Sequence, residues 1–293
     1  MLKVACIPTY NEERTISDII KRSLIQVDKV IVCDDGSNDD TSQKAKDAGA
    51  TVIRHEKNLG KGAALKSLFK HAKEIGADIV VTIDGDGQFL PEEIGKLIQP
   101  ILNNDSDIVI GYRFHDSTEI PSYRKAGNKI LDKITNMAAE LPFRDTQSGF
   151  RAYSKKALES IKFSSDGFGA DSEILVNASQ KGLKISEVKV SVIYDTGGKT
   201  STKNPISHSA GVLTSLIELI ALRHPLTYLG IPGLILMIIG TTFSVYVISI
   251  FNETRYFSIP STLVSLGSLV IGVILLLMSV VLFSIARATR REH

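Results

Sequence analysis

Residues 79–88 read IVVTIDGDGQ, an apolar strand pattern that runs directly into two carboxylates. Asp84 and Asp86 are two positions apart, so their side chains can converge where the strand ends. Gly85 and Gly87 leave the backbone open to a ligand. Hard divalent cations such as Mg²⁺ or Mn²⁺ prefer oxygen ligands, and diphosphate oxygens can complete their coordination shell. The stretch therefore predicts a metal-assisted nucleotide-sugar site at the end of a buried strand.

The sequence around this stretch alternates strand and helix patterns. Apolar strand-like runs at 2–7, 30–33, 51–53, 79–83 and 108–110 are separated by helical patterns that begin near Ile16, Gly62 and Pro91. Such alternation predicts an α/β fold with a mostly parallel sheet and helices on both faces. Ligands of such sheets bind at the carboxyl ends of the strands. The polar motifs PTYNE (8–12), DDGS (34–37) and DGDGQ (84–88) each follow a predicted strand.

A dinucleotide-binding dehydrogenase would need a glycine-rich turn after the first strand. The turn PTYNE contains no glycine, and NLGKG at 58–62 is neither G-x-G-x-x-G nor a Walker A loop. The NLGKG stretch is at least as well explained by a helix start as by a phosphate contact. The pattern therefore argues against a dehydrogenase.

Composition narrows the function further. The chain has 293 residues, a formal net charge of +2 and 23% charged residues, so we expect neither a nucleic-acid partner nor bulk disorder. Cys6 and Cys33 lie in strand-like runs and are predicted to be buried thiols in a reducing compartment. Residues 1–7 are too short for the apolar region of a signal peptide. We therefore expect the N-terminal part to remain in the cytosol.

Two long stretches in the last third of the chain, 226–251 and 259–286, contain no charged residue. About 20 apolar residues suffice for a helix to cross the hydrocarbon core of a bilayer. Arg223 precedes the first stretch, and Arg287, Arg290 and Arg291 follow the second. The positive-inside rule then predicts two transmembrane helices with both flanks cytoplasmic and the connection 252–258 outside.

Four motifs in order carry a family resemblance: the three above and DTQSGFR at 145–151. Together they resemble the inverting family 2 glycosyltransferases of GT-A fold, and within these the polyprenyl-phosphate hexose synthases typified by dolichol-phosphate mannose synthase. The similarity spans about residues 2–205, and the two-helix tail is similar to that of bacterial and archaeal members. The resemblance implies a Rossmann-like GT-A domain at 1–205, a juxtamembrane amphipathic helix at 206–224 and a transmembrane anchor at 225–293. A third buried helix is the alternative for 206–224.

The resemblance also implies a nucleotide-sugar site formed by Pro8, Tyr10, Glu12, Cys33, Asp35, Asp84, Gly85, Asp86 and Gln88. Within it, Asp35 would meet the base and Asp84 would face the nucleotide and the sugar. Asp86 and Gln88 would hold the Mg²⁺ or Mn²⁺ ion together with the donor diphosphate, and Asp84 and Asp86 would be the catalytic pair. Either Lys199 or Lys203 could reach the donor phosphates, with a flexible linker as the alternative.

The acceptor side is expected on an amphipathic helix at 122–139, whose apolar stripe is Ala126, Ile130, Ile134, Met137 and Ala138. Arg124 and Asn128 are four residues apart and share a face of this helix. By resemblance, Arg113 and Arg124 would grip a lipid phosphate with Asn128 assisting, since the guanidinium fork binds phosphate oxygens in pairs. Solvated surface arginines are the alternative.

The implied activity is transfer of a hexose, mannose or glucose first, from a GDP- or UDP-sugar to dolichyl or undecaprenyl phosphate. A phosphate monoester is largely ionised at neutral pH and needs no base. In agreement, the sequence indicates no histidine–carboxylate pair poised as a base. A processive polysaccharide synthase is disfavoured because the chain has no Trp. A transferase that extends a lipid-linked saccharide or other glycan, and a non-catalytic nucleotide-sugar-binding membrane protein, remain alternatives. Whether the chain forms a homo-oligomer is open.

Overall fold

The computed structural model describes residues 1–113, 132, 135–136, 142–164, 169–193 and 225–289. The chain divides into two compact units, residues 1–216 and 217–293, which are described separately. The predicted boundaries at 205 and 224 border or fall within the segment 194–224, outside the described residues, and stay predictions. The same holds for the amphipathic helix predicted at 206–224.

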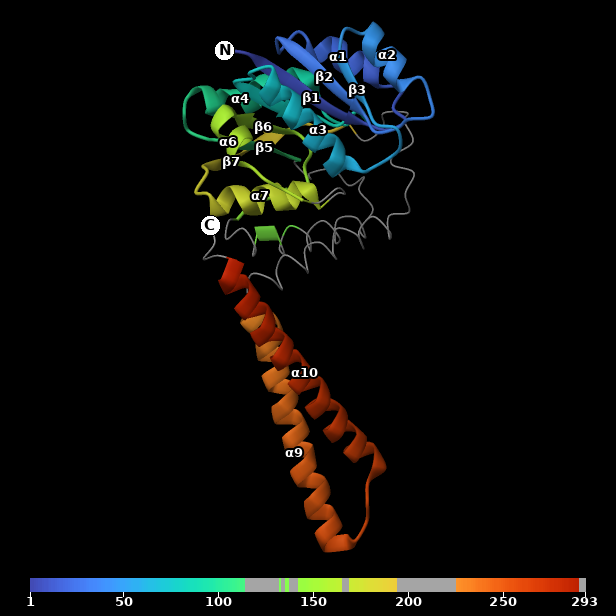
Figure 1. Ribbon diagram of the computed structural model, residues 1–293, viewed down its shortest axis with the longest axis vertical. Coiled ribbons are helices and arrows are strands. Elements are labelled where there is room, and N and C mark those ends of the chain that lie inside the picture. The colour runs from blue at the N-terminus through green and yellow to red at the C-terminus, as the bar shows by residue number, and fades with distance from the viewer. Residues whose placement is uncertain (114–131, 133–134, 137–141, 165–168, 194–224, 290–293) are drawn as a thin grey trace. The chain divides into compact units, whose positions relative to one another are not determined.

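The N-terminal unit is built on a seven-stranded sheet with the strand order β3-β2-β1-β4-β6-β5-β7 (Figure 1). Its strands are β1 (Lys3–Thr9), β2 (Lys29–Asp34), β3 (Thr51–Arg54), β4 (Ile79–Thr82), β5 (Ile108–Arg113), β6 (Arg151–Ser154) and β7 (Ile185–Val190). β6 pairs antiparallel with both β4 and β5, whereas the other pairings are parallel. The prediction of a mostly parallel sheet is confirmed.

Helices cover both faces of this sheet, as Figure 1 shows. One face packs against α1 (Ile16–Ser23), α2 (Thr41–Asp47) and α4 (Ile94–Leu102), which follows a 3₁₀ turn at Pro91–Glu93. The other packs against α3 (Lys61–Glu74), α6 (Lys155–Ser160) and α7 (Ala170–Gln180). Buried side chains such as Ile20 and Leu68 each contribute about 1.5–3 kcal/mol to these two cores.

Strands β6 and β7 were not predicted from the sequence, whereas the run predicted at 108–110 is β5. β6 is only four residues long, and β7 reads ISEVKV, with charged residues interrupting its apolar pattern. Neither gives the continuous apolar signal of β1 or β4, and helices α2, α6 and α7 were missed as well. Of the helix predicted at 122–139, the structure describes Asp132, Thr135 and Asn136, and these three have helical backbone. The apolar stripe of that helix lies outside the described residues.

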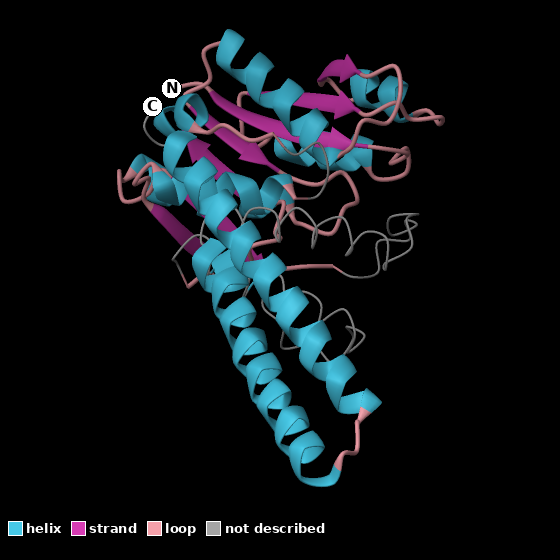
Figure 2. Ribbon diagram, turned by 60° about the horizontal axis from the view of Figure 1, so that its bottom comes forward, coloured by secondary structure: helices cyan, strands magenta, loops and turns pink. Residues whose placement is uncertain are grey.

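The C-terminal unit contains two long helices, α9 (Ile231–Thr254) and α10 (Ile259–Thr289), which lie side by side as an antiparallel hairpin (Figure 2). A π-helical turn at Leu226–Gly230 leads into α9. The spans Leu226–Thr254 and Ile259–Ser284 are long and apolar enough to cross a membrane, judged by length and composition. The connection is 255–258, shorter than the predicted 252–258, because α9 continues to Thr254 before Arg255 ends it in the left-handed region (φ 55°).

Small residues let the two helices of the hairpin approach closely. A Cβ atom on Gly233 would lie 2.9 Å from the carbonyl oxygen of Gly272, and one on Gly240 would lie 2.9 Å from the carbonyl oxygen of Ser265. The Ser265 hydroxyl donates to the carbonyl oxygen of Gly240 at 3.0 Å. Larger apolar side chains of both helices remain exposed, Leu263 by 66%. This arrangement is typical of helix pairs that pack within lipid.

Candidate functional site

The predicted motifs meet at one edge of the sheet. β1, β2 and β4 run parallel and end at Thr9, Asp34 and Thr82, at an edge that we call the carboxyl edge. The loops that follow β1 and β2 are joined, because the Asn11 amide donates to Ser37 Oγ at 2.8 Å and the Asn38 amide donates to Asn11 Oδ1 at 2.9 Å. The carboxyl edge therefore holds PTYNE, DDGS and DGDGQ together.

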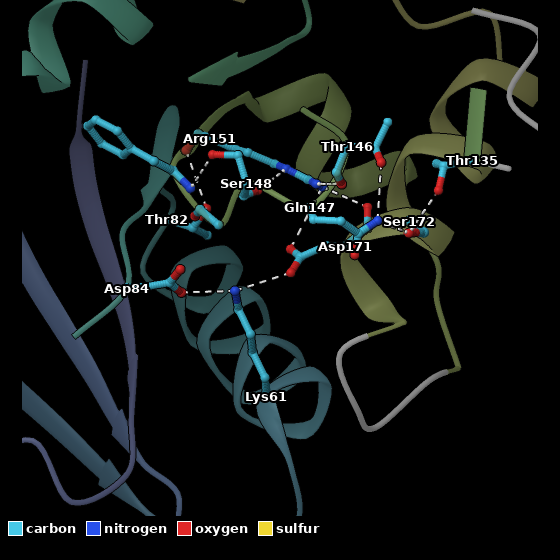
Figure 3. A network of polar contacts seen from close by, with 12 residues as sticks. Lys61, Thr82, Asp84, Thr135, Thr146, Gln147, Ser148, Arg151, Asp171 and Ser172 are labelled. Carbon is cyan, nitrogen blue, oxygen red and sulfur yellow. Dashed lines mark hydrogen bonds and ion pairs between the residues drawn. The ribbon is translucent and has the colours of Figure 1, made fainter. Parts of the chain in front are cut away.

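Asp84 is paired with a lysine that the sequence analysis did not select. Lys61 Nζ lies 2.9 Å from Asp84 Oδ1 and 3.1 Å from Asp171 Oδ2, and its side chain is only 14% exposed. Lys61 begins α3 and Asp171 stands in the first turn of α7 (Figure 3). Burial lowers the pKa of Lys61, but the carboxylates of Asp171 and Asp84 outweigh it and hold that pKa above its ordinary value. The lysine is therefore charged at neutral pH.

The charges of the two nearby carboxyl groups, Asp86 and Glu12, are less well compensated than the charge of Asp84. Asp86 Oδ1 accepts the Gln88 amide at 3.0 Å, and burial together with the charge of Asp84 raises the pKa of Asp86 to about 6. Burial together with the charge of Asp86 raises the pKa of Glu12 to about 7. Crowded carboxylates resist ionisation, and a bound cation would relieve that repulsion.

The carboxylates fit a hard divalent cation only in part. Among the described residues, no group of three or more His, Cys, Asp or Glu side chains is arranged to hold a metal ion. Mg²⁺ in particular is often held by one or two carboxylates plus substrate phosphates rather than by an all-protein cage. Asp86 therefore fits as a protein ligand whose shell a diphosphate would complete.

The predicted role of Gln88 as a metal ligand stays a prediction. Its amide donates to Asp86, and its carbonyl oxygen accepts the Ile193 amide at 2.9 Å. These backbone contacts fix the turn that follows Asp86.

Gly85 is explained by packing. A Cβ atom at this position would lie 2.7 Å from Thr9 Cγ2, at the end of β1. The Gly85 carbonyl oxygen accepts the Thr15 hydroxyl at 2.6 Å. The glycine thus lets the turn after β4 lie directly on β1, and a role in binding the nucleotide sugar stays a prediction.

Asp35, the predicted base contact, is buried and hydrogen-bonded to the chain itself. Its Oδ1 lies 2.7 Å from His55 Nδ1 and accepts the Leu59 amide at 3.0 Å, and its Oδ2 accepts the Gly60 amide at 2.7 Å. His55 Nε2 lies 2.9 Å from Ser67 Oγ. The sequence indicated no histidine–carboxylate pair poised as a base. The structure does pair His55 with Asp35, and both side chains are largely buried. His55 was missed because it is 20 residues from Asp35 and pairs with it only in the folded sheet.

The remaining predicted nucleoside contacts also lie at the carboxyl edge. Pro8 and Tyr10 are half-buried. The Cys33 carbonyl oxygen accepts the Thr9 hydroxyl at 3.3 Å, and burial with the nearby Asp35 raises the pKa of the Cys33 thiol to about 12. Cys6 and Cys33 are both buried free thiols, as predicted.

Arg113, the predicted acceptor contact at the end of β5, is bound by a buried carboxylate. Its Nε donates to Asp145 Oδ2 at 2.6 Å and its Nη2 donates to Asp145 Oδ1 at 2.8 Å. β4 and β5 both pair antiparallel with β6, so β5 runs in the same direction as β4 and Arg113 also lies at the carboxyl edge. The other predicted phosphate contacts, Arg124, Asn128, Lys199 and Lys203, lie outside the described residues.

The DTQSGFR motif forms a wall beside Asp84, and its arginine holds that wall in place. Arg151 is fully buried and donates to the carbonyl oxygens of Thr146 at 2.7 Å, Ser148 at 2.8 Å and Asp171 at 2.8 Å (Figure 3). From the sequence, this motif carried the family resemblance, but its individual residues had no predicted role. For Lys61 the one available signal was the NLGKG stretch, and Asp171 carried none.

Comparisons with known proteins place this geometry in a family. The sequence model of glycosyl transferase family 2 matches residues 4–162. The UDP-N-acetylglucosamine–dolichyl-phosphate N-acetylglucosaminyltransferase of Methanococcus voltae is 36% identical over 211 residues, covering 64% of this chain and 84% of the relative. The dolichol-phosphate mannosyltransferase of Pyrococcus furiosus is 33% identical, with 67% and 58% covered.

Solved structures agree on the fold. Glucosyl-3-phosphoglycerate synthase of Mycobacterium tuberculosis, solved with Mn²⁺, uridine diphosphate and phosphoglyceric acid, matches with a TM-score of 0.58 at 23% identity. The match covers 74% of this chain and 78% of that one. The sheet and its flanking helices therefore have the GT-A architecture.

Proposed function

Because the chain belongs to glycosyl transferase family 2, we propose that it transfers a hexose from a nucleotide sugar to the phosphate of a polyprenyl lipid. Relatives from Methanococcus and Pyrococcus are named for dolichyl phosphate, and one from Aeromonas hydrophila, 27% identical over 254 residues, is named for undecaprenyl phosphate. Mannose and glucose are the sugars first proposed, and the Methanococcus relative adds N-acetylglucosamine to those worth testing.

One observation carries the proposal: two acidic side chains follow β4 at the carboxyl edge, beside a largely buried lysine. Asp86 would hold a Mg²⁺ or Mn²⁺ ion with the donor diphosphate and Gln88, and Asp84 would face the nucleotide and sugar. Pro8, Tyr10 and Glu12 are at the same edge and would line the nucleoside pocket, next to the buried Asp35.

The proposed reaction is a single displacement with inversion. An oxygen of the lipid phosphate forms a bond to the anomeric carbon, while the bond from that carbon to the donor diphosphate breaks. The electron pair leaves with the nucleoside diphosphate. The lipid phosphate is already ionised at neutral pH, so no protein base is required. A bound divalent cation would supply stabilisation of the charge that develops on the diphosphate.

The hairpin of α9 and α10 supports a membrane location. Its two apolar spans would anchor the chain in the bilayer that holds the lipid acceptor. Positive residues on both flanks favour a cytoplasmic catalytic domain and cytoplasmic termini.

The experiment that tests the function uses the purified full-length chain in lipid vesicles that contain polyprenyl phosphate. Labelled UDP- and GDP-sugars of glucose, mannose and N-acetylglucosamine are supplied singly, and the lipid product is identified by mass spectrometry. We expect one sugar to appear on the lipid phosphate, with the activity lost in chelator and restored by Mn²⁺ or Mg²⁺.

Three outcomes would contradict the proposal. Full activity after chelation would exclude the cation. Transfer only to a preformed lipid-linked saccharide would favour the extending transferase, and nucleotide-sugar binding without turnover would favour a non-catalytic protein.

A further inference from the structure

Lys61 is held in place by a carboxylate from a different strand. Asp35, which follows β2, accepts the amides of Leu59 and Gly60, the two residues before Lys61. Gly60 has φ 104°, a backbone conformation that favours glycine, and α3 begins at the next residue. The position of the lysine beside β4 is therefore set from the end of β2.

A wall of backbone confines the lysine on its other side. A Cβ atom on Gly149 would lie 2.6 Å from both Lys61 Nζ and Asp84 Oδ1, and closer still to Asp84 Oδ2. The Gly149 carbonyl oxygen accepts the Thr82 hydroxyl at 2.8 Å, and Arg151 fixes the carbonyl oxygens beside it. The ion pair of Lys61 and Asp84 therefore has little room to rearrange.

The ion pair of Lys61 and Asp84 also reduces the negative charge at the carboxyl edge. Glu12, Asp84, Asp86 and Asp171 bring four acidic groups to a small region, and a nucleotide sugar adds an anionic diphosphate. Within the described part of the chain, Lys61 is the basic residue in ion-pair contact with Asp84. Without it, both Asp84 and Asp171 would lose their lysine partner.

We propose that Lys61 is a positioning residue for the donor site: it occupies the carboxylate of Asp84 and so leaves the divalent cation to Asp86. The proposal rests on the proposed function in taking the ligand to be a nucleotide sugar. Lys61 acts through Asp84, and its charge also offsets the acidic groups that would otherwise repel the diphosphate.

The test compares Lys61→Met with Lys61→Arg in the purified full-length chain. Removal of the lysine frees Asp84 to join Asp86 on a cation, so Lys61→Met should bind Mn²⁺ in the absence of nucleotide about 3- to 10-fold more tightly, measured by electron paramagnetic resonance. Because the Asp84 carboxylate would then bind the cation instead of facing the nucleotide sugar, kcat should fall by about 100-fold. Lys61→Arg keeps the charge and should recover part of kcat.

Asp171→Asn is the second variant, because it removes one carboxylate of the lysine but leaves Asp84 paired. We expect a smaller loss of kcat and Mn²⁺ affinity close to that of the unmodified chain. Thermal unfolding of each variant establishes that it is folded.

Two results would overturn the proposal: a parallel loss of Mn²⁺ binding and kcat in Lys61→Met, as a purely structural role requires, or kcat and donor KM left unchanged. If the unmodified chain transfers no sugar, the proposed function fails, while the Mn²⁺ comparison still decides the role of Lys61.

Discussion

Two pairs of acidic residues lie at the ends of strands β2 and β4 in the same sheet, yet their surroundings differ. At the end of β2, Asp34 accepts the Ser37 amide at 2.8 Å and the Ser42 hydroxyl, and Asp35 accepts two further amides. After β4, Asp84 is held by an ion pair with Lys61, and the hydrogen bond described for the Asp86 carboxylate is the one from Gln88. The first pair is used to fix loops, whereas the second keeps acceptor capacity for a ligand.

The contrast between these pairs separates structural from functional carboxylates that look alike in the sequence. A buried carboxylate whose lone pairs are satisfied by the chain stabilises the fold, because removing it leaves donors unpaired. A carboxyl group with a raised pKa destabilises the fold when it is ionised. A ligand that binds the ionised form offsets this effect, so such a group indicates a binding site. The predictions below test this contrast.

The largest effect is expected from Asp86→Ala. Loss of the carboxylate that would hold the cation should lower sugar transfer by about 10³-fold, comparable to the loss of one electrostatic stabiliser of a transition state. Its thermal unfolding midpoint should stay near that of the unmodified chain, because few contacts are lost. Initial rates with saturating donor and Mn²⁺ measure the effect, and near-normal turnover would remove Asp86 from the site.

A smaller loss is expected from Gly149→Ala. The added Cβ would lie within 2.6 Å of Asp84 Oδ1, so the carboxylate must shift. A displacement of this kind should lower kcat by about 100-fold. Gly95→Ala is the matched control, because the nearest atom to its Cβ would be Gln26 Oε1 at 3.8 Å. Equal kcat values for the two variants would show that the wall beside Asp84 is irrelevant to transfer.

Asp34→Asn tests the structural pair. An amide in place of the carboxylate turns one acceptor into a donor, beside the Ser37 amide and Arg54. We expect a loss of about 1–3 kcal/mol in unfolding free energy and little change in Mn²⁺ affinity. Thermal unfolding of the full chain provides the measurement, with Asp86→Asn as the control that should not be destabilised. A stable Asp34→Asn protein with weakened Mn²⁺ binding would reverse the contrast.

The smallest effect concerns pH. The pKa of Glu12 is raised to about 7 and that of Asp86 to about 6, so the folded chain holds these protons at pH values where the unfolded chain has lost them. Their contribution to stability is therefore present in acid and lost as pH rises from about 4 to 7.

The comparison between the unmodified chain and the Glu12→Gln, Asp86→Asn double variant isolates the pH-dependent contribution of these two groups to stability. In metal-free buffer, the unfolding midpoint of the unmodified chain should fall relative to the variant as pH rises. Mn²⁺ should restore it at pH 7.5 more than at pH 5. Parallel pH profiles would mean that neither carboxyl group is perturbed.

The sequence predicted five of the seven strands, β1 to β5, and three of these show the clearest pattern. β1, β2 and β4 carry uninterrupted apolar runs, and each ends in a polar motif, so both the parallel sheet and the position of Asp84 and Asp86 followed from pattern alone. β6 escaped because its four residues include a buried arginine, which reads as polar until its carbonyl partners are known.

The site residues that were missed share one property: their role depends on contacts between distant segments. Lys61 meets Asp84 across 23 positions and Asp171 across 110, and neither spacing leaves a local signal. Asp35 was predicted as a base contact from resemblance, but its hydrogen bonds to the start of α3 became visible only in the fold. Hydrophobic periodicity therefore does not predict which distant segments come into contact.

The burial of both native cysteines has a practical consequence. Cys6 and Cys33 have no exposed surface, and the chain contains no other cysteine. A Lys155→Cys substitution, at an exposed position one strand length, or about 13 Å, beyond the start of β6, would create a single thiol open to reagents. A fluorophore could be attached there, at the edge of the sheet opposite the carboxyl edge, and the native thiols would not need to be removed first.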